Sequence, residues 1–252
     1  MEIYAQRYGS GEKVLFLHGA GGNAGSWYFQ AEYLRTYAEV IPVDMPGHGA
    51  DAGGYGLNSI EEYRDYVHEV TRKLDINKCY VVGHSMGGAV ALSFALTHRD
   101  MLKGLVLITT GARLRIVPEI LEGLKTDKEK TIRTIMDYGF AQTSPAKLKE
   151  GGVKEMMGCK TDVIYGDFNA CEHFDVMDSV NKIKVPTLII AGKYDLLAPP
   201  KFSEYLHRQI EGSKFVLVED AGHMVTLEKP KEVNEAIQEF ITATNPRQQV
   251  SG

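Results

Sequence analysis

The sequence is poor in cysteine, lacks any long apolar run and has no excess of positive charge. Its three cysteines, Cys79, Cys159 and Cys171, do not have the spacing of a disulfide framework or a zinc cluster. No stretch approaches the roughly 18 consecutive apolar residues of a membrane-spanning helix, and the first residues lack the features of a secretory signal. A net charge of −5 does not indicate the excess of basic residues that nucleic-acid binding requires. These absences predict a cytoplasmic protein with no membrane span and no nucleic-acid partner.

What the sequence has in excess is glycine. Its 252 residues include 26 glycines, about a tenth of the chain against a usual ~7%. Clusters of them follow three short apolar runs, at residues 14–17, 40–43 and 79–82. Apolar runs without polar alternation are typical of strands buried on both faces of a parallel sheet. The glycine clusters therefore mark the ends of predicted strands.

Strand-like and helical patterns alternate along most of the chain. Further short apolar runs occupy residues 105–108, 187–190 and 215–218. Helical stripes begin after a capping box at Ser59 and at Pro230. This alternation predicts an α/β fold, with a mainly parallel sheet of about eight strands and helices on both faces. Residues 3–8 are expected to form an antiparallel hairpin with the run at 14–17.

Residues 111–180 break this rhythm. They have helical patterning and charge but no strong buried strand, and prolines and a glycine pair divide them into short helices. The segment is too short and too polar for an independent domain. We therefore expect it to be an insertion that covers one end of the sheet, while residues 1–110 and 181–252 form the core.

The strongest chemical signal is the sequence Gly83-His84-Ser85-Met86-Gly87, between a predicted strand and an apolar helix. A serine hydroxyl is a weak nucleophile and needs both exposure and a nearby base. A sharp strand-to-helix turn provides the exposure, and the flanking glycines let strand and helix approach. Chance alone produces G-x-S-x-G in on the order of one in ten such chains. The prediction of a nucleophile therefore depends on the position of the motif; an ordinary helix-capping serine is the alternative.

Five motifs, in this order, resemble those of the α/β-hydrolase family: residues 18–22, 44–49, 83–88, 192–195 and 222–223. The resemblance covers residues 14–109 and 185–240. It implies that Ser85 is the nucleophile, Asp195 the acid and His223 the base. It also implies an oxyanion hole made by the backbone N–H groups of Ala20 and Met86, and it identifies residues 111–180 as the helical cap of this family.

Position in the predicted sheet points to the same acid and base. Asp195 follows the predicted strand at residues 187–191, and His223 follows the one at 215–218. Carboxyl ends of parallel strands share one edge of a sheet, so the two side chains are expected to meet there. The structural alternatives are that Asp195 caps the next turn and that His223 is a turn histidine.

The other histidines near the glycine clusters are predicted to be structural. His18 is expected to support the oxyanion loop, His48 to belong to a loop, and His84 to point away from Ser85. No metal-ligand spacing links them, and residues 19–22 lack the spacing of a dinucleotide fingerprint. The expectation is therefore no metal and no cofactor.

The sequence predicts a serine hydrolase that cleaves carboxylic esters of small-to-medium acyl chains through an acyl-enzyme. Its expected partner is a small-molecule ester, bound in an apolar pocket that Trp27, Phe140, Leu196 and Met224 help to line. A lactone, a thioester or a carbon–carbon bond could be cleaved by the same three residues. A non-catalytic small-ligand receptor on the same fold is a more remote alternative. The protein is expected to be a monomer or a homodimer.

Overall fold

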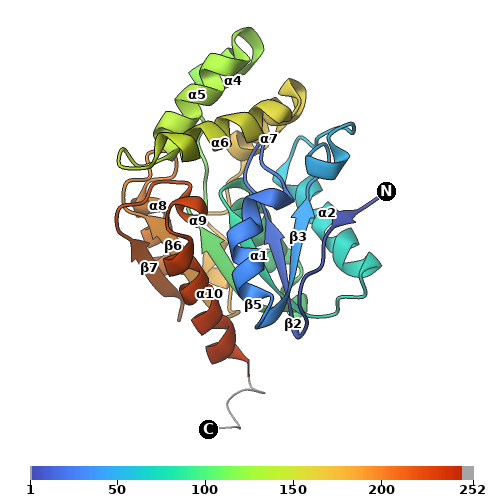
Figure 1. Cartoon of the computed structure of the whole chain (residues 1–252). Coiled ribbons are helices and arrows are strands. Elements are labelled where there is room, and N and C mark those ends of the chain that lie inside the picture. Colours follow the sequence, from blue (N-terminus) through green and yellow to red (C-terminus); the bar gives the residue numbers. More distant parts are fainter. Residues whose placement is uncertain (1, 246–252) are drawn as a thin grey trace.

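Seven strands form one sheet in the computed structural model, which describes residues 2–245 (Figure 1). The spatial order is β1-β3-β2-β4-β5-β6-β7, and every neighbouring pair except β1–β3 is parallel. The predicted α/β fold is confirmed, with seven strands where about eight were expected. The strands are β1 (Tyr4–Ala5), β2 (Glu12–Leu17), β3 (Ala38–Asp44), β4 (Cys79–His84), β5 (Leu102–Ile108), β6 (Thr187–Gly192) and β7 (Lys214–Val218).

The expected amino-terminal hairpin was wrong. β1 is antiparallel as expected, but it pairs with β3, with Tyr4 opposite Asp44 and Ala5 opposite Val43. β2 lies between β3 and β4 and has parallel partners on both sides. No free edge of β2 therefore remains for a hairpin, and the turn at residues 9–11 carries the chain past β3 instead.

Helices cover both faces of the sheet because successive strand residues point to opposite sides. On β2, Leu15 and Leu17 face the core that includes α2 (Ile60–Lys73), α3 (Met86–Thr97) and α8 (Pro200–Gln209). Val14 and Phe16 face the core that includes α1 (Tyr28–Leu34) and α10 (Pro230–Thr244), which lie toward the viewer in Figure 1. The remaining short helical segments of the core are α9 (Val225–Glu228) and turns at Ala24–Trp27, Gly49–Asp51, Arg99–Met101 and Val180–Lys182.

Four helices form a separate layer beyond one end of the sheet, at the top of Figure 1. They are α4 (Pro118–Thr126), α5 (Lys128–Gly139), α6 (Ala146–Gly158) and α7 (Thr161–His173), and we call them the cap segment. They share an apolar cluster of their own, to which Leu124, Ile132 and Ile164 belong. Within residues 2–245, no helix is both long and apolar enough to span a bilayer.

Candidate active site

Ser85 occupies the turn between β4 and α3 in a strained backbone conformation. Its φ of 54° and ψ of −117° lie in a region that side-chain-bearing residues rarely adopt. Two hydrogen bonds hold the turn: the Ser85 N–H donates to Ile108 O (3.0 Å), and the Thr110 hydroxyl donates to Ser85 O (2.9 Å). The turn directs Ser85 to the carboxyl end of the sheet, where it lines a cavity.

The glycines around Ser85 are required by close backbone packing. A Cβ atom on Gly83 would lie 2.1 Å from Gly87 O, and one on Gly87 would lie 2.1 Å from Leu17 O. Neither position can therefore hold a larger residue without moving a strand or a helix. This packing brings α3 against the ends of both β2 and β4.

Asp195 and His223 meet at the same edge of the sheet. His223 Nδ1 lies 2.8 Å from Asp195 Oδ2, and the other carboxylate oxygen accepts the N–H groups of Leu197 and Ala198, both at 2.8 Å. Close packing of the two loops makes the contact possible, since a Cβ atom on Gly192 would lie 2.0 Å from Gly222 O. Three donors therefore fix a carboxylate that is only 2% exposed.

His223 lines the same cavity as Ser85. In the described part of the chain, neither Ser85 Oγ nor His223 Nε2 has a hydrogen-bond partner. Both groups are thus available to a bound molecule. Hydrogen bonds between nucleophile and base are commonly long without substrate and tighten when it binds.

The loop after β2 lies against Ser85 and carries one free amide. A Cβ atom on Gly19 would lie 3.2 Å from Ser85 Cβ, so the loop lies against the nucleophile. The N–H groups of Gly21 and Gly22 are both engaged, with Asp167 Oδ2 and Gly19 O. Among residues 2–245, no acceptor takes the N–H groups of Ala20 or Met86. These are the two donors that the resemblance assigns to an oxyanion hole.

The cavity has a volume of about 680 Å³ and lies between the sheet and the cap segment. Three of the four residues expected in the pocket, Trp27, Leu196 and Met224, line it. Phe140 does not: it is 2% exposed and packs in the apolar cluster of the cap segment. The end of α5 turns this ring toward α6, where a Cβ atom on Gly152 would touch it at 3.2 Å.

One polar group in the cavity wall has no counterpart in the sequence-based prediction. Glu155 of α6 accepts a hydrogen bond from the Ser26 hydroxyl at 2.5 Å, and both residues line the cavity. Burial raises the pKa of the Glu155 carboxyl. In the sequence, this glutamate resembles any other charged residue of a surface helix, so no local signal identified it.

His18 and His84 are buried and neutral. His18 donates from Nδ1 to Gly19 O (2.8 Å) and accepts the Met45 N–H at Nε2 (3.1 Å), an arrangement that only the neutral ring can make. His84 Nε2 lies 2.9 Å from His223 O. Burial lowers the pKa of each ring to about 3, with a smaller contribution from neighbouring histidines. The two rings therefore hold the backbone of the loop after β2 and of His223 in place through these hydrogen bonds.

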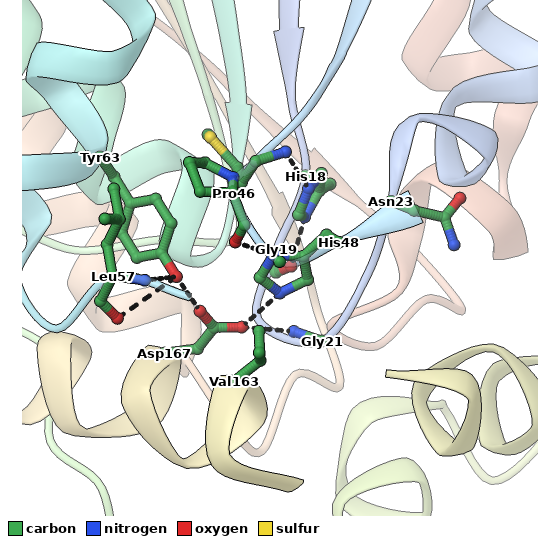
Figure 2. A network of polar contacts seen from close by, with 12 residues as sticks. His18, Gly19, Gly21, Asn23, Pro46, His48, Leu57, Tyr63, Val163 and Asp167 are labelled. Atoms are coloured by element: carbon green, nitrogen blue, oxygen red, sulfur yellow. Dashed lines mark hydrogen bonds and ion pairs between the residues drawn. The ribbon is translucent and has the colours of Figure 1, made fainter. Parts of the chain in front are cut away.

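His48 is fully buried, and its partner Asp167 was missed by the sequence analysis. His48 Nε2 lies 2.8 Å from Asp167 Oδ2, and Figure 2 shows both residues in one polar network next to α7. Burial acts to lower the pKa of His48, but the charge and the hydrogen bond of Asp167 outweigh it and raise this pKa well above its usual range. Within residues 2–245, no cluster of three or more metal-ligating side chains is present.

Known proteins resemble this chain over most of its length. The sequence model of the alpha/beta hydrolase family matches residues 14–236. The pimeloyl-[acyl-carrier protein] methyl ester esterase of Neisseria meningitidis serogroup C is 31% identical, with 84% of this chain and 86% of that protein covered. A solved thermophilic esterase has 36% identity and a TM-score of 0.85, with 96% and 99% coverage. Est816, described as an N-acyl homoserine lactone degrading enzyme, has 25% identity and a TM-score of 0.86, with 94% and 96% coverage.

Proposed function

This chain belongs to the alpha/beta hydrolase family, and we propose that it is a serine hydrolase that cleaves carboxylic esters of small-to-medium acyl chains. The observation that carries the proposal is the 2.8 Å contact between His223 Nδ1 and Asp195 Oδ2, in a site where His223 and Ser85 line one cavity. Similarity to two proteins named as esterases adds support.

In the proposed reaction, His223 donates its Nδ1–H to Asp195 and keeps a lone pair at Nε2. That nitrogen removes the proton of Ser85 as the serine oxygen attacks the ester carbonyl. The resulting oxyanion accepts the N–H groups of Ala20 and Met86. His223 then gives the proton to the departing alcohol. A water molecule, deprotonated by the same nitrogen, hydrolyses the acyl-enzyme and restores Ser85.

The cavity supports an uncharged acyl chain of modest length. Its volume of about 680 Å³ lies within the usual range for small-molecule sites, roughly 300–1,000 Å³. Trp27, Leu196 and Met224 supply apolar surface. The cap segment closes the cavity opposite the sheet, and we take residues 111–180 to be an inserted cap on a core formed by 1–110 and 181–252.

A lactone is the second candidate substrate, and similarity to Est816 favours it. The three residues would act in the same order on a cyclic ester. The only difference is that the alcohol formed in the first step stays attached to the acyl chain. Substrate shape, not the chemistry of the site, therefore separates the two candidates.

Hydrolysis of p-nitrophenyl acetate, butyrate and octanoate, and of γ- and δ-lactones of similar size, tests the proposal. Wild type should turn over the esters, and Ser85→Ala should lower kcat by about 10⁴-fold or more. Fast lactone opening with poor ester turnover would favour the second candidate. Tight binding of these compounds without serine-dependent turnover would indicate a receptor and overturn the proposal.

A further inference from the structure

Asp167, at the middle of α7, is a buried side chain of the cap segment with three hydrogen-bond contacts to the core. Its carboxylate is fully buried and reaches three separate parts of the core (Figure 2). Asp167 Oδ2 accepts the Gly21 N–H at 2.8 Å and lies 2.8 Å from His48 Nε2. Asp167 Oδ1 accepts the Tyr63 hydroxyl at 2.5 Å. The cap segment is thus bonded directly to the loop that carries Ala20.

The geometry indicates that this is a buried ion pair. His48 Nδ1 lies 3.0 Å from Pro46 O, which can only accept a hydrogen bond, so that nitrogen carries a proton. Its Nε2 faces the carboxylate of Asp167, which accepts at both oxygens, so Nε2 carries a proton as well. The ring is therefore an imidazolium. Gly21 donates to an ionised acceptor, which makes a stronger hydrogen bond than a neutral one.

This bond fixes the peptide group next to the candidate oxyanion donor. Gly21 has a φ of +65°, and a Cβ atom there would lie 2.8 Å from Met156 Cγ of α6. The Gly22 N–H donates to Gly19 O at 3.1 Å and closes the other side of the turn. Ala20 lies between these two fixed points. Gly19 O also accepts a hydrogen bond from His18 Nδ1 at 2.8 Å. If the bond to Asp167 is lost, the turn is held only at Gly19 O, and the direction of the Ala20 N–H is less tightly set.

We propose that Asp167 is a positioning residue for the oxyanion hole. Paired with His48, it holds the Gly21 amide and thereby sets the direction of the Ala20 N–H. The oxyanion hole is then completed by the cap segment, although neither of its donors belongs to that segment. This inference rests on the proposed hydrolase function.

If Asp167 only supported the structure, other losses from the same network would lower activity equally. A substitution of Tyr63 distinguishes this structural role from the positioning role. Tyr63 donates to the same carboxylate and is fully buried, but no hydrogen bond joins it to residues 19–22. Tyr63→Phe therefore weakens the same network without releasing Gly21. Asp162→Asn, at an exposed site in the first turn of α7, is a matched control for the change of a carboxylate on this helix.

The experiment compares Asp167→Asn, Asp167→Ala, Tyr63→Phe and Asp162→Asn with wild type on p-nitrophenyl butyrate, well below each thermal midpoint. Asp167→Ala should lower kcat roughly 10–100-fold with KM within threefold, somewhat less than loss of an oxyanion donor. Asp167→Asn keeps the shape of the side chain, so its kcat should lie between those of wild type and Asp167→Ala. A trifluoromethyl ketone, which forms an oxyanion on the enzyme, should bind more weakly in the same proportion. The two controls should stay within threefold in both measurements.

Two results would overturn this inference without touching the proposed function. In the first, both Asp167 variants keep the kcat and the ketone affinity of wild type. In the second, Tyr63→Phe lowers kcat and ketone affinity as much as the Asp167 variants do. If Asp167→Ala does not fold, Asp167→Asn decides, with an expected fall in kcat of about 3–10-fold. Absence of serine-dependent turnover in wild type would contradict the proposed function and, with it, this inference.

Discussion

Asp195 and Glu155 are both shielded carboxylates, but their hydrogen-bond partners differ. Asp195 is held by two backbone N–H groups and His223, so its position is fixed. Glu155 accepts the Ser26 hydroxyl and lines a largely apolar cavity, whose wall also includes Arg115 and Glu119. In its ionised form, the Glu155 carboxylate repels a substrate that carries a negative charge of its own. Glu155 is therefore a candidate for selecting neutral esters.

Glu155→Gln tests this selection. The charged p-nitrophenyl monoester of adipic acid and neutral p-nitrophenyl hexanoate form a matched pair of similar length. The substitution should raise kcat/KM for the charged ester about fivefold, because about 1 kcal/mol of repulsion is removed. The neutral ester should change by less than twofold. An equal change in kcat/KM for both substrates would show that Glu155 does not discriminate between charged and neutral esters.

At the scale of elements, glycines in two helices have opposite roles. Gly87 lies in the first turn of α3, where the helix touches β2, and a Cβ atom there would lie 2.1 Å from Leu17 O. Gly151 lies in α6, where a Cβ atom would point into open space. The first glycine is required by close contact, whereas the second only weakens its helix.

The pair Gly87→Ala and Gly151→Ala tests this difference by urea unfolding. Gly151→Ala should stabilise the protein by about 0.5–1 kcal/mol, because alanine favours the helix. Gly87→Ala should destabilise it by about 2 kcal/mol or more, because the strand must move to accept the methyl group. Similar effects of the two substitutions would show that the contact between α3 and β2 is looser than the structure indicates.

At the scale of the whole molecule, three buried histidines make the free energy of unfolding depend on pH, and two of them act in the opposite sense to the third. His18 and His84 have pKa values of about 3, far below the ordinary value of 6.5. Below pH 6.5 the unfolded state therefore binds up to roughly two more protons than the folded state, and stability falls as the pH falls. His48 has a raised pKa, so above pH 6.5 the folded state holds the extra proton and stability falls as the pH rises.

Urea midpoints between pH 5 and 8 test this balance. Wild type should be most stable near pH 6.5 and lose stability on both sides, since the histidines titrate in opposite senses. Asp167→Asn removes the charge that raises the His48 pKa. The decline between pH 6.5 and 8 should therefore shrink in this variant, and the acid decline should persist. An unchanged alkaline decline in Asp167→Asn would contradict a charged His48.

The fold and the meeting of Asp195 with His223 could be predicted because each residue lies in the loop that follows a strand of the parallel sheet. Parallel strands bring such positions to one edge, whatever their separation in sequence. Asp167 lies 146 residues from Gly21 and within a helix, so no strand end marks it. The signal available was a carboxylate on a helical face shared with Val163 and Ala170.

Two errors have related physical causes. The hairpin prediction assumed that neighbours in sequence pair, but β2 already has β3 and β4 on its two sides. The assignment of Phe140 to the pocket relied on its hydrophobicity, which does not distinguish a cavity wall from the interior of the cap segment. In both cases the outcome depends on three-dimensional neighbours that a local pattern does not contain.

The central claim is that Ser85 is an activated nucleophile, and labelling with a fluorophosphonate probe tests it most directly. Mass spectrometry of the intact protein, followed by peptide mapping, would count and locate the adducts. The account predicts one adduct per chain, on Ser85, and none in Ser85→Ala. An unlabelled wild type, or an adduct on another residue that persists in Ser85→Ala, would contradict it.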